Sequence, residues 1–167
     1  MIKKNLIALS LSALASFLTQ AQALETGAKA PACLMQNFTD DKPLDLAAYS
    51  GKVVYLDFWA SWCGPCLQSM PFMDEVQAQL GPRGLQVVAI NLDENHADAQ
   101  QFLDNHPVNI HVVTTQDDSC PNKYGVQAMP SSFLIDRKGN VRYIQTGFRK
   151  GETSEIRERL EKLLSEG

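Results

Sequence analysis

The stretch that decides the fold is Val53–Cys66, with the sequence VVYLDFWASWCGPC. Five of the six residues in Val53–Phe58 are β-branched, aromatic or leucine, and this composition predicts a buried central strand. The segment that follows the second cysteine, LQSMPFMDEVQAQL, has helical character. Cys63 and Cys66 therefore lie where a strand gives way to a helix, a position that suits redox chemistry.

The pattern around this stretch predicts an α/β fold. A helix over Pro65–Leu80 has apolar side chains at three- and four-residue spacing, namely Leu67, Met70, Met73, Val76 and Leu80. Further strands are predicted at 33–38, 85–91, 110–113, 131–135 and 141–146, the first as a short edge strand, and further helices at 95–106, 117–124 and from 151 onward. Early strands joined through helices run parallel and the final hairpin adds antiparallel strands, so we expect a central mixed β-sheet flanked by helices on both faces.

Length and composition indicate one globular domain after the N-terminal segment. The chain has 167 residues, of which 44% are hydrophobic and 20% are charged. This length suffices for one hydrophobic core and is short for two. The formal net charge of −4 gives no reason to expect nucleic acid or an anionic membrane surface as a partner.

Residues 1–23 have the pattern of a secretory signal peptide. Lys3 and Lys4 form a short basic region, Leu6–Leu18 is mostly apolar, and 21–23 reads Ala-Gln-Ala, an A-x-A cleavage signature. We therefore expect cleavage after Ala23 and a mature domain over 24–167, exported to a periplasm. The alternative is that the segment is retained as a membrane anchor.

A CxxC pair has two common uses, as half of a zinc site or as a redox dithiol. A zinc site needs two more ligands, yet His96, His106 and His111 are scattered and no second CxxC is present. We therefore expect no metal and no cofactor other than the redox-active disulfide Cys63–Cys66.

The redox interpretation assigns a role to each residue of the motif. Cys63 lies at a helix N-terminus, where free backbone N–H groups and the helix dipole stabilise a thiolate, so we expect it to be the nucleophile. Cys66 lies three residues further on and can attack the mixed disulfide to release the product. Gly64 leaves space for a bound partner, and Pro65 costs no hydrogen bond in the first helical turn.

Asp57 is the second informative residue, because it is a carboxyl group within an otherwise apolar strand. Burial raises the pKa of a carboxyl group, so Asp57 is a candidate to hold or pass a proton for Cys66. The alternative is an aspartate that faces solvent at a strand bulge.

These motifs resemble the thioredoxin superfamily, in particular the TlpA/ResA-like exported branch. The resemblance rests on YLDFWASWCGPC, on Gly51-Lys52 before the central strand, and on YGVQAMPSSFLIDRKGNV some sixty residues later. It implies a thioredoxin-like fold and a cis peptide bond before Pro130, with the backbone of Met129 pairing with an extended substrate. Gly147 is implied to line the same groove, although it equally fits a glycine that ends a strand. The predicted substrate-binding residues are Trp62, Gly64, Pro65, Met129, Pro130 and Gly147.

Cys33 and Cys120 remain outside the motif. In an exported protein, two further cysteines are most simply paired, so we expect a structural disulfide between them. The alternative is two separate buried cysteines that act as small hydrophobic residues.

The sequence thus predicts an exported thiol–disulfide oxidoreductase that reduces disulfide-bearing partner proteins. Reduction in an oxidising compartment needs electrons from elsewhere, so a membrane-embedded electron donor is the implied partner, and we expect a monomer. The alternatives are an oxidant or isomerase that uses the same residues, and a metal-handling thiol protein.

Overall fold

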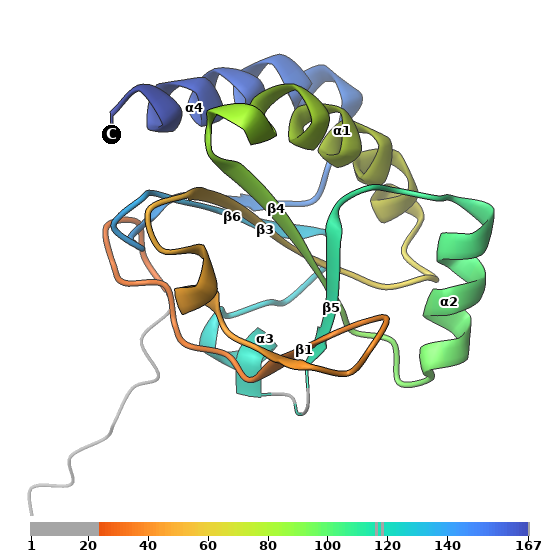
Figure 1. Ribbon diagram of the computed structural model, residues 1–167. Coiled ribbons are helices and arrows are strands. Elements are labelled where there is room, and N and C mark those ends of the chain that lie inside the picture. Colours follow the sequence, from red (N-terminus) through yellow and green to blue (C-terminus); the bar gives the residue numbers. More distant parts are fainter. Residues whose placement is uncertain (1–23, 116, 118, 167) are drawn as a thin grey trace, which may run out of the picture.

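The computed structural model describes residues 24–115, 117 and 119–166, so the predicted signal peptide lies outside the described residues. The seven strands form one sheet in the order β2-β1-β5-β4-β3-β6-β7 (Figure 1). Their bounds are β1 Met35–Asn37, β2 Pro43–Leu44, β3 Val53–Trp59, β4 Leu85–Asn91, β5 His111–Thr115, β6 Ser131–Ile135 and β7 Val141–Thr146. The α-helices are α1 Gly64–Leu80, α2 His96–Asn105, α3 Ser119–Lys123 and α4 Thr153–Ser165, and short 3-10 helices span Leu46–Tyr49, Gly81–Arg83 and Lys150–Glu152.

The sheet is mixed, as predicted. β3 pairs in parallel with β4, and β4 pairs in parallel with β5, because each connection crosses over through a helix. On the other side of β3 the strands alternate in direction, β6 being antiparallel to β3 and β7 antiparallel to β6. β3 therefore lies inside the sheet, with a partner strand along each of its edges.

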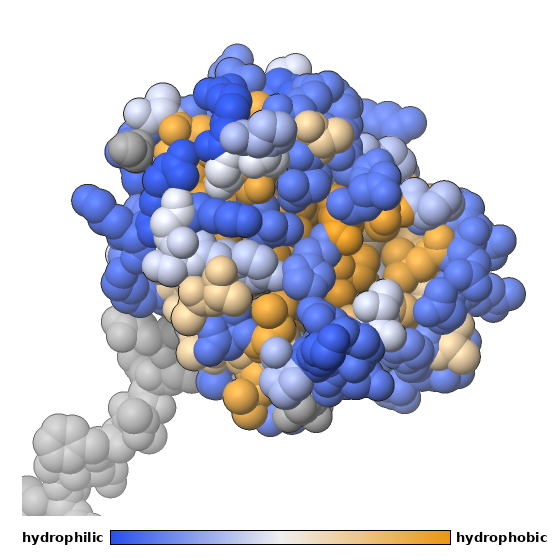
Figure 2. All heavy atoms as spheres, in the orientation of Figure 1, coloured by the Kyte–Doolittle hydropathy of each residue, from blue (hydrophilic) through white to orange (hydrophobic). Residues whose placement is uncertain are grey.

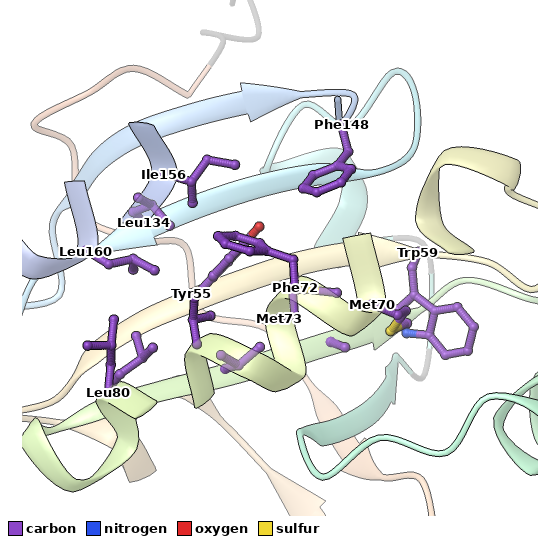
Figure 3. Packing of buried hydrophobic residues seen from close by; sticks show 14 of the residues in the cluster. Tyr55, Trp59, Met70, Phe72, Met73, Leu80, Leu134, Phe148, Ile156 and Leu160 are labelled. Carbon is purple, nitrogen blue, oxygen red and sulfur yellow. The ribbon is translucent and has the colours of Figure 1, made fainter. Parts of the chain in front are cut away.

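The alternation of side chains along β3 divides the core into two layers. Tyr55 and Trp59 belong to the layer that packs against α1 and α4, whereas Leu56 and Phe58 belong to the layer on the opposite face, together with residues of α3. Figure 3 shows Tyr55 and Trp59 packing toward the apolar side chains of α1. Helices therefore cover both faces, as expected.

Two details of the predicted core were wrong. Leu67 was predicted to face the core, but 42% of its surface is exposed. Cys66 and Met70, four residues apart, take the inward positions of the first turns of α1, so Leu67 is turned away from the core. The strand predicted at 33–38 is shorter, and it is not at the edge, because β2 pairs with its outer side.

The structure joins Cys33 to Cys120 in a disulfide, with the Cα atoms 5.1 Å apart. Both side chains are buried in the layer that contains α3. The hydroxyl of Tyr124 donates to the carbonyl of Pro31 at 3.1 Å, and Lys123 Nζ donates to the carbonyl of Ala32 at 3.1 Å. The segment before β1 is therefore attached to α3 by covalent and polar contacts.

We predict that replacing Cys33 and Cys120 by serine lowers the free energy of unfolding of the oxidised protein by about 4 kcal/mol. The physical reason is the large loop, since the two cysteines are separated by 87 residues. Urea denaturation measures the change. The matched control, Cys63→Ser with Cys66→Ser, opens a loop of only 3 residues and should cost less. Equal losses for the two pairs would contradict the prediction.

Candidate active site

The dithiol is a disulfide at the start of α1, with the Cα atoms of Cys63 and Cys66 5.3 Å apart. Cys63 is the N-cap residue of α1, and the backbone N–H of Cys66 donates to Cys63 Sγ at 3.2 Å. Cys63 is 5% exposed, whereas Cys66 is fully buried. A partner thus has access to Cys63 alone, and after reduction the same N–H group and the helix dipole favour the thiolate of Cys63.

The rim of the dithiol is exposed and partly apolar. Trp62 is 72% exposed, Gly64 and Pro65 are also exposed, and Leu67 lies one turn further along α1. A hollow between α1 and the segment that follows α2 is lined in part by Leu67, Met70, Pro71, Pro107 and Val108. Figure 2 shows further apolar surface between β5 and α2. This arrangement leaves apolar side chains free beside the reactive sulfur.

A polar clamp that sequence reasoning missed fixes the loop before Cys63. The backbone N–H and the hydroxyl of Ser61 both donate to the carboxylate of Asp93, each at 2.8 Å. Asn91 Nδ2 donates to the same carboxylate at 2.7 Å. β3 and β4 are parallel, so their carboxyl ends lie at the same edge of the sheet. The polar residues Asn91 and Asp93 at the end of β4 could therefore have been predicted to lie near the loop that follows β3.

The Met129–Pro130 peptide bond is cis, which is the geometry that the resemblance implies. Pro130 is buried, and Met129 is partly buried against the core layer that includes both active-site cysteines. The N–H of Gly147 donates to the carbonyl of Pro130 at 2.7 Å, so the segments before β6 and after β7 lie together. Gly147 follows the last residue of β7 and has φ +78, so it also ends the strand. A substrate-binding role for these residues stays a prediction.

Asp57 is fully buried in β3, so the alternative of a solvent-facing aspartate is wrong. It lies between Tyr55 and Trp59 in the alternation and therefore faces the layer of α1, which also contains Cys66. Its cross-strand partner is Ser132 of β6, whose hydroxyl donates to Asp57 Oδ1 at 2.5 Å. Burial raises the pKa of Asp57 from 3.8 to about 7, and the hydrogen bond from Ser132 opposes part of that rise.

Two further properties concern metals and membranes. Among the residues that the structure describes, histidine, cysteine, aspartate and glutamate form no group of three or more that is suited to a metal ion. None of the described helices combines the length and the apolar character needed to cross a membrane.

Comparisons with known proteins place this geometry in a family. The Redoxin family model matches residues 25–160. The chain belongs to the Redoxin family. It is 32% identical to Thiol-disulfide oxidoreductase ResA of Geobacillus thermodenitrificans over 158 residues, covering 95% of this chain and 89% of that protein. It is 31% identical to ResA of Bacillus subtilis over 126 residues, covering 75% of this chain and 70% of that protein.

Solved structures agree with this assignment. A protein from Chlorobium tepidum assigned as thiol:disulfide interchange protein DsbE superposes with a TM-score of 0.81 and 42% identity, covering 85% of this chain and 99% of that one. The exposed lipoprotein thioredoxin Etrx1 of Streptococcus pneumoniae superposes with a TM-score of 0.69 and 28% identity, covering 80% and 100%. The thioredoxin-like fold and the TlpA/ResA-like branch are thereby confirmed, and the protein is an oxidoreductase of the thiol–disulfide class.

We predict that Asp57 makes stability fall with rising pH. Between 3.8 and about 7, the folded protein holds a proton on Asp57 that the unfolded chain has released. Stability contributed by the protonated group is therefore lost as the pH rises through this window, by about 4 kcal/mol in total. Asp57→Asn should be more stable than the wild type at pH 8 and should lack this slope.

Urea denaturation at a series of pH values measures the effect. Asp104→Asn is the matched control, since it makes the same chemical change on the exposed face of α2. It should retain the pH dependence of the wild type. A wild-type slope that persists in Asp57→Asn would contradict the prediction.

Proposed function

We propose that this protein is an exported thiol–disulfide oxidoreductase that uses Cys63 and Cys66 to reduce disulfides in periplasmic partner proteins. The observation that carries the proposal is the asymmetry of the dithiol. Cys63 keeps 5% of its surface exposed at the N-terminus of α1, whereas Cys66 is fully buried in the layer that Asp57 faces. A two-step exchange needs an attacking sulfur that a partner can reach and a resolving sulfur that it cannot reach.

The reaction begins when the Cys63 thiolate attacks the disulfide of a partner and forms a mixed disulfide. Cys66 then loses its proton to Asp57 and attacks Cys63 Sγ, which closes the Cys63–Cys66 disulfide. The sulfur of the partner leaves as a thiolate and takes up a proton. Two electrons have then passed from the dithiol to the partner.

Partner recognition is assigned to the surface around Cys63. Trp62, Gly64 and Pro65 form the exposed rim, and Met129, Pro130 and Gly147 form the adjacent segment. An extended partner segment would pair with the backbone of Met129, so recognition would depend little on the partner's side chains.

Export and electron supply complete the proposal. The signal-like segment 1–23, the Cys33–Cys120 disulfide and the similarity to an exposed lipoprotein thioredoxin support a location outside the cytoplasm. In a reductase there, the Cys63–Cys66 disulfide must be reduced again after each turnover. We therefore propose a membrane-embedded dithiol donor as its second partner.

We predict that Cys66→Ser accumulates a covalent mixed disulfide through Cys63 when it meets a peptide that contains a disulfide. Attack still occurs in this variant, but the resolving sulfur is missing. Mass spectrometry under non-reducing conditions detects the adduct. Cys63→Ser is the control and should form none, because Cys66 is buried. Turnover by Cys63→Ser would refute the proposed function.

We predict a reduction potential below about −250 mV for the Cys63–Cys66 couple, in the range of reducing thioredoxins. Equilibration with glutathione or dithiothreitol buffers, followed by thiol trapping, measures the value. The variant without Cys33 and Cys120 provides the control for the second disulfide. A potential near about −120 mV would make the protein an oxidant and exclude the reductive direction.

A further inference from the structure

Asp57 has a single side-chain hydrogen-bond partner in the part of the chain that is described. Ser132 faces it across the β3–β6 pairing and donates to Oδ1, whereas the neighbour of Asp57 on β4 is Ala89, which has no polar side chain. Asp57 Oδ2 is buried and has no partner among the described residues. The two carboxyl oxygens therefore have different environments.

We propose that Ser132 is a positioning residue for Asp57, whose hydroxyl holds Oδ1 so that Oδ2 is the oxygen that exchanges the proton of Cys66. This inference rests on the proposed function. In the mixed-disulfide state, the S–H bond of Cys66 breaks and its proton goes to Oδ2. The Cys66 thiolate forms a bond to Cys63 Sγ, the bond from Cys63 to the partner breaks, and the departing sulfur takes up the proton from Asp57, directly or through solvent.

The polarity of the surroundings explains why one hydroxyl matters. Asp57 is packed in a mainly apolar layer with side chains such as Leu134 of β6, Met73 of α1 and Leu160 of α4. The titratable groups of that layer include Tyr55 on β3, whose pKa the charge of Asp57 raises, and, in the reduced protein, Cys66 on α1. No cation of the described residues contributes to the pKa of Asp57. A hydrogen bond from Ser132 is therefore the main contact that favours the charged carboxylate, which is the form that accepts a proton.

Tyr55 does not replace this contact. Its hydroxyl is buried and makes no hydrogen bond of good geometry among the described residues, although Ser132 lies close enough to lower its pKa slightly. Burial, and then the charge of Asp57, raise the pKa of Tyr55, so the phenol stays neutral at physiological pH. Ser132 is therefore the side chain that holds the carboxyl group of Asp57.

The first test titrates Asp57 directly, by NMR of labelled aspartate carboxyl carbons in the oxidised protein. Ser132→Ala should move the midpoint upward by about one pH unit, because a hydrogen bond to a charged group is lost. Ser132→Thr retains the hydroxyl and should restore the wild-type midpoint. Ser131→Ala is the matched control, since Ser131 is an equally buried neighbour whose hydroxyl donates to the carbonyl of Ala128. An unchanged midpoint in Ser132→Ala would overturn the inference.

The second test follows the release step in a single turnover with oxidised glutathione. Acid quenching and mass spectrometry record the decay of the glutathione adduct on Cys63 across the pH range. In Ser132→Ala the pH midpoint of this decay should rise in parallel with the NMR midpoint. In the Asp57→Asn background, Ser132→Ala should cause no further change, because the group on which it acts is gone. An effect of equal size in both backgrounds would show a merely structural role and overturn the inference.

The activity of Cys63→Ser tests the proposed function, whereas the pH profile of Ser132→Ala tests the role of Ser132. If Cys63→Ser still reduces glutathione, the proposed function fails, whatever the NMR titration of Asp57 shows. If Cys63→Ser is inactive and the pH profile of Ser132→Ala equals that of the wild type, only the positioning role of Ser132 fails. Thermal unfolding of every variant checks that each titration reports a folded protein.

Discussion

The fixed register of β3 is the constraint on which the rest of the site depends. β3 is buried on both faces and pairs along its whole length with β4 and over Val54–Phe58 with β6. Since neighbouring side chains of a strand enter opposite faces, a slip of one residue would move Asp57 into the layer of α3. The pairing on both edges prevents such a slip. It places Asp57 opposite Ser132 and starts α1 directly beyond the carboxyl end of the strand.

Burial of Asp57 links the chemistry of the site to its cost in stability. A carboxylate in an apolar layer is unfavourable, and the same effect raises the pKa of Asp57 to about 7. An ordinary exposed aspartate would be ionised near neutral pH and would be a weak proton acceptor. The buried group instead exchanges protons readily at neutral pH, so the property that destabilises the fold also suits the group to serve Cys66.

The sequence predicted the parts of the fold that local patterns determine. The apolar run of β4 predicted this strand with its observed bounds, because a strand buried between neighbours needs mostly apolar residues. The hairpin turn at 136–140 predicted β6 and β7 on either side of it, also with their observed bounds. The prediction that Leu67 faces the core was wrong, because periodicity shows which residues share a helix face but does not fix which face meets the core in the first turn. Ser132 and the Ser61–Asp93 clamp were not predicted, because their partners are set by cross-strand register and by the meeting of strand ends. The cis bond before Pro130 came from the resemblance, since the residues alone indicate only a proline that opens a strand.

The sheet also separates two disulfides that lie on opposite faces and differ in their access to a partner. Cys33 and Cys120 are 2% and 0% exposed in the layer of α3, whereas Cys63 keeps 5% of its surface exposed at the start of α1, next to the exposed Trp62. Exchange requires an attacking sulfur to reach one of the bonded sulfurs, so access selects the Cys63–Cys66 bond. The two disulfides also lie in different core layers, on opposite faces of the sheet. The Cys33–Cys120 bond attaches the β1 segment to α3 on the face opposite α1, so the covalent support of that layer is separate from the dithiol at the start of α1.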